Sequence, residues 1–216
     1  MIFELSEDIN LIPNPKYAEE DGLLAVGGDL SVKRLLALYS NGIFPWFNEG
    51  DPILWWSPDP RYIIMMYDFT VRKSLRKFMK KSNYEVRFNT NFREVVLNCK
   101  SSERKDQEGT WITKEIVESY CELNKLGYAI SVEVYDNSDL IGGLYGVAIG
   151  KMFAGESMFS KKSYASQIAL VYLYNYLKER NFHFIDCQIY SKHLEQFGAF
   201  PHEREFFLDL LKKALL

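Results

Sequence analysis

The chain has 216 residues, of which 47% are hydrophobic and 25% charged, and its formal net charge is −3 at pH 7. Such a chain can bury a sizeable core, so the composition excludes a disordered or fibrous protein. Residues 1–8 are acidic and lack a long apolar run, which predicts neither a secretory signal nor a membrane span and favours the cytoplasm. Three cysteines and three histidines without metal-ligand spacing predict reduced thiols and no metal site.

Residues 1–62 are rich in turn-forming and aromatic residues, and we expect them to form a small N-terminal domain. A helix is predicted over 32–40, because Ser31 can cap its start and Asn41-Gly42 can end it. The following segment, 44–60, is dense in Trp and Pro and is expected to be mostly irregular packed loop.

The tryptophans of this loop allow two interpretations. Trp55 and Trp56 are interpreted as packing residues. Trp46 lies in a non-periodic segment beside Pro45, which makes it a candidate for stacking on a base or for lining a site.

The segment 71–84 contains six basic residues and no acids. Its apolar residues recur on one side of a helix, so the segment predicts an amphipathic helix with charge of one sign on its outer face. A solvated face is the ordinary interpretation, but like charges at this spacing repel and would gain from an anionic partner. The candidate phosphate-binding residues are Arg72, Lys73, Arg76, Lys77, Lys80 and Lys81.

The elements expected next are a short strand over 84–88, a short helix over 91–98 and a charged turn over 101–109. Thr113 then caps a predicted helix, 114–126, which Gly127 ends. Trp111 lies two residues before this cap. Functional residues are often found at such loop-to-helix junctions, so Trp111 is a candidate site residue.

The last part of the chain predicts a continuous α/β unit. Three adjacent antiparallel strands are expected over 130–135, 140–148 and 152–159, followed by a helix over 165–180 and a strand over 182–189. A helix between two strands can connect parallel neighbours in one sheet. This order favours an α/β or α+β domain over residues 63–216.

Polar side chains interrupt the last two of these strands. Side chains two apart on a strand share a face, so Asp186 and Gln188 are expected to point into one place about 7 Å apart, while Cys187 faces away as a packed thiol. A carboxylate and an amide that merely tie loops together are the structural alternative. Glu156 could bind a ribose hydroxyl, orient an amine or recognise a basic group, and its structural alternative is a salt bridge within the core.

Several short motifs occur in a fixed order along the chain. They are Gly27-Gly28-Asp29-Leu30, Gly42-Ile43-Phe44-Pro45-Trp46, Trp55-Trp56-Ser57-Pro58-Asp59-Pro60, Thr110-Trp111-Ile112-Thr113, Gly142-Gly143-Leu144-Tyr145-Gly146, Gly155-Glu156-Ser157-Met158-Phe159-Ser160 and Asp186-Cys187-Gln188. In this order they resemble leucyl/phenylalanyl-tRNA–protein transferases over almost the whole chain. The resemblance implies an acetyltransferase-like (GNAT-like) C-terminal domain and a tRNA surface on the basic helix. It also implies transfer of Leu or Phe from Leu-tRNA or Phe-tRNA to proteins that begin with Arg or Lys, which marks them for degradation.

The chemistry of this transfer suits the polar residues. An aminoacyl ester is already activated, so no nucleotide triphosphate, metal or other cofactor is expected. The enzyme has to orient the acceptor amine, remove a proton and stabilise an oxyanion. Gln188 is the expected direct partner of the amine, Asp186 is expected to orient Gln188 and balance positive charge, and Glu156 is the third catalytic candidate. The substrate-binding candidates are Trp46, Trp111, Leu144, Phe153, Met158, Leu173 and Ile185.

Two other functions are compatible with parts of this pattern. An acyl-CoA N-acyltransferase of the same fold would carry a Gly-rich pyrophosphate loop before the crossover helix, and residues 160–165 contain no glycine. A non-catalytic tRNA-binding module would explain the basic helix but would leave the polar residues of the last strands without a role.

Overall fold

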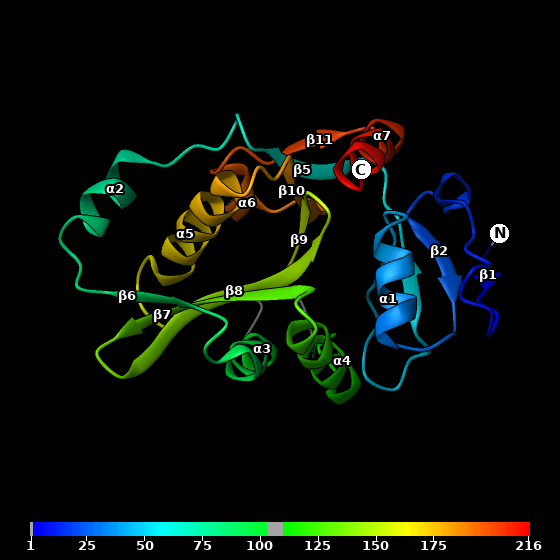
Figure 1. The fold of residues 1–216 in the computed structure, drawn as a ribbon, viewed down its shortest axis with the longest axis horizontal. Coiled ribbons are helices and arrows are strands. Elements are labelled where there is room, and N and C mark those ends of the chain that lie inside the picture. The colour runs from blue at the N-terminus through cyan, green and yellow to red at the C-terminus, as the bar shows by residue number, and fades with distance from the viewer. Residues whose placement is uncertain (1, 103–109) are drawn as a thin grey trace.

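The protein is described here by a computed structural model that covers residues 2–102 and 110–216 (Figure 1). The N-terminal part forms a four-stranded sheet in the order β1-β2-β4-β3, with strands Phe3–Glu4, Leu23–Val26, Leu54–Trp56 and Phe44–Pro45. The predicted helix is confirmed as α1 (Val32–Tyr39), and the Ser31 side chain accepts a hydrogen bond from the Arg34 N–H. The prediction of a mostly irregular segment over 44–60 is confirmed, and the two short strands β3 and β4 pair within it.

A seven-stranded sheet forms the rest of the framework, in the order β11-β5-β10-β9-β8-β7-β6. Its strands are β5 (Arg61–Met65), β6 (Glu85–Phe88), β7 (Ala129–Asp136), β8 (Asp139–Ile149), β9 (Met152–Ser160), β10 (Phe184–Gln188) and β11 (Phe200–His202). The predicted antiparallel strands are confirmed as β7, β8 and β9. Among the described strands of this sheet, β9 and β10 form the only parallel pair, and α5 (Ala165–Glu179) connects them as expected.

Helices cover both faces of the large sheet, which gives a mixed α/β architecture. Figure 1 shows α5 on one side of β7, β8 and β9, and α3 (Phe92–Ser101) with α4 (Lys114–Lys125) on the other. The remaining helices are α2 (Lys73–Met79), α6 (Lys192–Glu195), α7 (Arg204–Ala214) and a 3₁₀ turn at Pro15–Tyr17. A glycine permits the close approach of α5 to the sheet, since a Cβ on Gly142 would lie 2.4 Å from that of Ala165.

The division into domains 1–62 and 63–216 stays a prediction. Residue 62 lies within β5, and one buried cluster contains Trp55 of the small sheet together with Val95 of α3 and Phe207 of α7. The predicted turn over 101–109 lies largely outside the described residues. Within the described ranges, no helix combines the length and apolarity needed to cross a bilayer.

Candidate functional site

A cavity of about 860 Å³ lies where the parallel strands separate. The pairing of β9 with β10 runs from Met152↔Phe184 to Ala154↔Asp186 and ends there. Beyond this point the two strands no longer pair with each other, although β9 continues to pair with β8 and Gln188 pairs with Tyr62 of β5. The cavity is lined by all of the predicted catalytic and substrate-binding residues, namely Trp46, Trp111, Leu144, Phe153, Glu156, Met158, Leu173, Ile185, Asp186 and Gln188.

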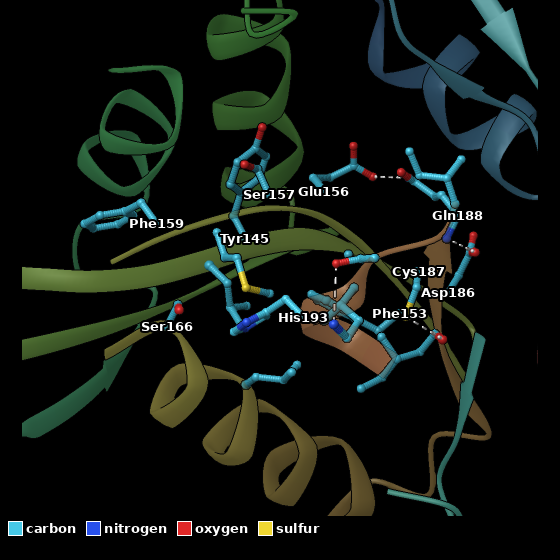
Figure 2. A pocket seen from close by; sticks show the side chains of 18 of the residues that line it. Tyr145, Phe153, Glu156, Ser157, Phe159, Ser166, Asp186, Cys187, Gln188 and His193 are labelled. Carbon is cyan, nitrogen blue, oxygen red and sulfur yellow. Dashed lines mark hydrogen bonds between the residues drawn. The ribbon is translucent and has the colours of Figure 1, made fainter. Parts of the chain in front are cut away.

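The backbone directs Gln188 into this cavity. A register shift separates Asp186 from Gln188 in the pairing of β10 with β5, and Gln188 has a φ of 67°, in the left-handed region that non-glycine residues rarely adopt. The Gln188 N–H donates to Oδ1 of Asp186 at 2.9 Å and holds this conformation. The side chain then turns toward β9, where its Nε2 donates to Oε1 of Glu156 at 3.2 Å (Figure 2).

Asp186 lines the same cavity as Gln188, but its side chain has different hydrogen-bond partners. Its carboxylate receives two hydrogen bonds from Arg61, from Nε at 2.9 Å and from Nη2 at 2.7 Å, and both side chains are only 1% exposed. The guanidinium also lies 4.8 Å from the ring of Phe44 and 4.4 Å from the ring of Phe207. The register shift of β10 against β5 falls between Asp186 and Gln188, so the regular alternation of a strand is interrupted there.

Glu156 is held by neutral donors. The hydroxyl of Tyr39 donates to Oε1 at 2.8 Å, the hydroxyl of Tyr120 donates to Oε2 at 3.2 Å, and the two hydroxyls contact each other. Glu156 makes no ion pair with any described residue, so the alternative of a core salt bridge is wrong for it. Desolvation raises the pKa of this half-buried carboxyl to about 7, despite the opposing effect of the tyrosine hydrogen bonds.

Sequence reasoning missed the three residues that hold the two carboxylates. Tyr39 and Tyr120 lie on the buried faces of α1 and α4, where an aromatic residue at helical spacing indicates only packing. Arg61 begins an apolar strand that was not predicted, and a charged residue at that position is the only signal the sequence offers. It lies 125 positions from its partner, Asp186.

Apolar side chains form the wall of the cavity opposite the polar groups. Leu144, Phe153, Leu173 and Ile185 are buried, and the buried Leu170 of α5 lines the cavity with them. Met158 is half-buried. These side chains give the cavity an apolar surface, which suits an aliphatic or aromatic group of a ligand.

The two predicted tryptophans, Trp46 and Trp111, also line the cavity. Trp46 is half-buried and its ring centroid lies 5.7 Å from that of Trp56. Trp111 is 5% exposed and precedes α4, whose N-cap Thr113 accepts a hydrogen bond from the Ile116 N–H. Trp46 therefore offers more accessible ring surface than Trp111.

Cys187 of β10 is buried and also lines the cavity. Burial raises the pKa of its thiol well above the ordinary value, which agrees with the packed thiol expected from the sequence. Among the described residues, no three His, Cys, Asp or Glu side chains gather in a way that could hold a metal ion.

The basic residues of α2 are not part of the cavity. The helix is shorter than predicted, and it packs against α5 through the buried Leu75 at the end of the molecule opposite the small sheet (Figure 1). All six basic side chains are exposed, and none forms an ion pair with a described residue. Lys73 lies in the first turn, where a positive charge is unfavourable for the helix dipole.

Comparisons with known proteins indicate the same family over most of the chain. The family model for leucyl/phenylalanyl-tRNA protein transferase matches residues 63–212, and the model for the N-terminal domain of the same family matches residues 28–59. The leucyl/phenylalanyl-tRNA–protein transferase of Flavobacterium johnsoniae is 48% identical over 98% of this chain and 99% of the relative. That of Flavobacterium psychrophilum is 52% identical over 93% of this chain and 95% of the relative.

Solved structures resemble the chain only weakly. L-PGS from Bacillus licheniformis gives a TM-score of 0.43 at 13% identity, over 80% of this chain and 55% of that one. A likeness at this level supports no assignment to a particular α/β fold family.

Proposed function

Because the chain belongs to the leucyl/phenylalanyl-tRNA–protein transferase family, it transfers an aminoacyl group from tRNA to a protein, and we propose that Leu-tRNA and Phe-tRNA are the donors. The proposed acceptors are the α-amino groups of proteins that begin with Arg or Lys, which the added residue marks for degradation. The reaction takes place in the cytoplasm and uses no cofactor, because the ester bond to tRNA already supplies the driving force.

The hydrogen bond from Gln188 to Glu156 is the observation that carries the mechanism. Since the amide Nε2 donates to Glu156, the amide oxygen is left to accept a hydrogen bond from the incoming amine. The amine attacks the ester carbonyl carbon, and a tetrahedral intermediate forms. The bond to the ribose oxygen then breaks, and the proton lost by nitrogen ends on that oxygen.

Glu156 is the proposed relay for this proton. A carboxyl with a pKa of about 7 exchanges protons readily at neutral pH, and it lies one hydrogen bond behind Gln188. It is also the only carboxylate of the cavity that no described cation pairs with, which supports a second role in attracting a basic acceptor residue. Asp186 acts as a positioning residue, since its oxygens bind Arg61 and the Gln188 backbone.

The apolar wall is the proposed pocket for the donor side chain. Met158 has a flexible, unbranched side chain, which supports acceptance of both leucyl and phenylalanyl groups. Trp46 and Trp111 are proposed to contact the terminal adenosine of the tRNA, with Trp46 as the stacking surface. The parallel pair β9 and β10 with its crossover helix supports an acetyltransferase-like domain as the framework.

The exposed basic face of α2 is the proposed contact for the tRNA backbone. Replacing Arg76, Lys77, Lys80 and Lys81 with Gln should weaken use of Leu-tRNA and reduce the salt dependence of binding by somewhat under one log-log unit for each lost contact. Leucyl-adenosine lacks the acceptor stem, so its use should barely change. Unaltered use of the full tRNA over a range of salt would place the stem elsewhere.

The function is tested by incubating the protein with labelled Leu-tRNA and a peptide that begins with Arg, with and without acyl-CoA. Label should reach the peptide without acyl-CoA, and a matched peptide with a blocked N-terminus should receive none. Gln188→Ala should lower transfer by about 100-fold or more while tRNA affinity stays nearly constant. Transfer that requires acyl-CoA would instead indicate an acyl-CoA N-acyltransferase.

A further inference from the structure

His193 presents a buried nitrogen that the mechanism does not use. It belongs to α6, its ring lies 5.7 Å from that of Phe197, and it lines the cavity. Its Nε2 is buried and has no hydrogen-bond partner within the described parts of the chain. Burial lowers the pKa of this imidazole, so at neutral pH it is uncharged and one of its nitrogens is an acceptor.

The position of His193 differs from that of the polar groups described above. Figure 2 shows it apart from Glu156 and Gln188, on the side of the cavity toward α5. This is the side from which Leu170 and Leu173 contribute to the apolar wall. A group bound between that wall and Gln188 would therefore have His193 as a neighbour.

The proposed donor has a group that needs such a neighbour. The α-carbon of a leucyl ester carries the isobutyl side chain, the carbonyl carbon and an α-amino group. With the side chain in the apolar wall and the carbonyl at Gln188, the α-amino group must face a third direction. A buried amine without an acceptor is costly. The carboxylates of the cavity already accept hydrogen bonds from Tyr39, Tyr120, Gln188 and Arg61, whereas Nε2 of His193 has no hydrogen-bond partner among the described residues.

We propose that Nε2 of His193 accepts a hydrogen bond from the α-amino group of the donor. This inference rests on the proposed function, because it assigns a subsite of the same cavity. It makes His193 a specificity-determining residue, which favours aminoacyl donors over acyl donors that have the same side chain but no amine.

The test compares leucyl-adenosine with 4-methylpentanoyl-adenosine, which lacks only the α-amino group. The two esters differ in intrinsic reactivity, so kcat/KM is compared between proteins for each donor. His193→Ala should lower use of leucyl-adenosine about 10- to 100-fold and leave 4-methylpentanoyl-adenosine unchanged. His193→Gln retains an acceptor oxygen and should recover part of the loss.

Leu173→Ala serves as the matched control, since it alters the apolar wall and should weaken both donors alike. An equal effect of His193→Ala on both donors, or no effect on either, would overturn the inference. If the unaltered protein transfers from neither leucyl-adenosine nor Leu-tRNA, the proposed function itself fails.

A second measurement avoids substitution. In the unaltered protein, the ¹⁵N resonance of His193 Nε2 should shift when an uncleavable leucyl-adenosine amide binds. The analogue without the α-amino group should produce a much smaller shift. Equal shifts with the two analogues would contradict the hydrogen bond even if a variant failed to fold.

Discussion

Asp186 and Glu156 are two carboxylates of one cavity, on neighbouring strands, in different electrostatic surroundings. Asp186 is buried against Arg61 and receives charged hydrogen bonds at both oxygens. Glu156 receives hydrogen bonds from two hydroxyls and one amide, all of them neutral. The comparison teaches that the partner decides the role: a charged partner fixes a carboxylate in place, whereas neutral donors leave it able to exchange a proton.

Removing Asp186 should produce the largest effect, because it leaves the guanidinium of Arg61 buried without a counter-charge. Asp186→Ala should lower the free energy of unfolding by about 3–5 kcal/mol, measured by urea denaturation. It should also lower transfer by about 100-fold or more, since Gln188 loses the acceptor that holds its backbone.

The double variant Arg61→Met with Asp186→Leu is the control for this effect. It replaces both charges with apolar side chains and should recover most of the stability. Transfer should stay low, because no group then holds the Gln188 N–H. Recovered transfer would show that the pair contributes stability alone.

Replacing Glu156 should affect the reaction more than the fold. Glu156→Gln should lower transfer by about 100-fold near neutral pH, because the amide cannot take up a proton. In the unaltered protein the rate should rise as the pH passes through about 7, where Glu156 ionises. A variant whose rate keeps the same rise with pH would assign that ionisation to another group.

The same carboxyl should give stability a pH dependence of opposite sign to that of a salt-bridged acid. Its pKa is about 7 in the fold and near the ordinary 4.5 when unfolded, so between these values the folded state holds a proton that the unfolded state has lost. Stability therefore falls as the pH rises through this window. Glu156→Gln should gain stability relative to the unaltered protein over the same range, as measured by urea denaturation at several pH values.

Weakening the tyrosine contacts should produce the smallest effect. The hydrogen bond from Tyr39 favours the ionised form of Glu156, so Tyr39→Phe should raise the pKa of Glu156 further and move the pH–rate midpoint upward. Tyr62→Phe is a suitable control, since that ring packs against Tyr190 and gives Glu156 no hydrogen bond. A midpoint that does not move in Tyr39→Phe would contradict the role of the hydroxyl.

Local signals explain which parts of the fold could be predicted. The cap residues Ser31 and Thr113 located the starts of α1 and α4, and turn residues that separate the strand-forming runs located β7, β8 and β9. The short strands β3, β4 and β11 have only two or three residues, too few for a period to appear. The strand β5 was missed because its place in the sheet depends on pairing with β10, far along the chain.

In the candidate site, too, features with a local sequence signal could be predicted, whereas features that depend on distant contacts could not. The residues that line the cavity could be predicted from polar groups within apolar strands and from family motifs, although their roles stay predictions. The orientation of Gln188 could not, since a bulge and a left-handed residue cannot be read from alternation. The hydrogen-bond partners of Glu156 and Asp186 could not be predicted either, because only the tertiary fold brings Tyr39, Tyr120 and Arg61 to these carboxylates.

Glu156 connects parts of the chain that could be made as separate fragments. Tyr39 reaches it from α1, while Tyr120 and Gln188 reach it from the larger sheet and its helices. A cut in the exposed loop at residues 48–51 would place Tyr39 on one fragment and Glu156 on the other. Glu156 would then regain all of its hydrogen-bond donors only when the two fragments reassemble. The protonation state of Glu156 would therefore report whether the fragments have joined.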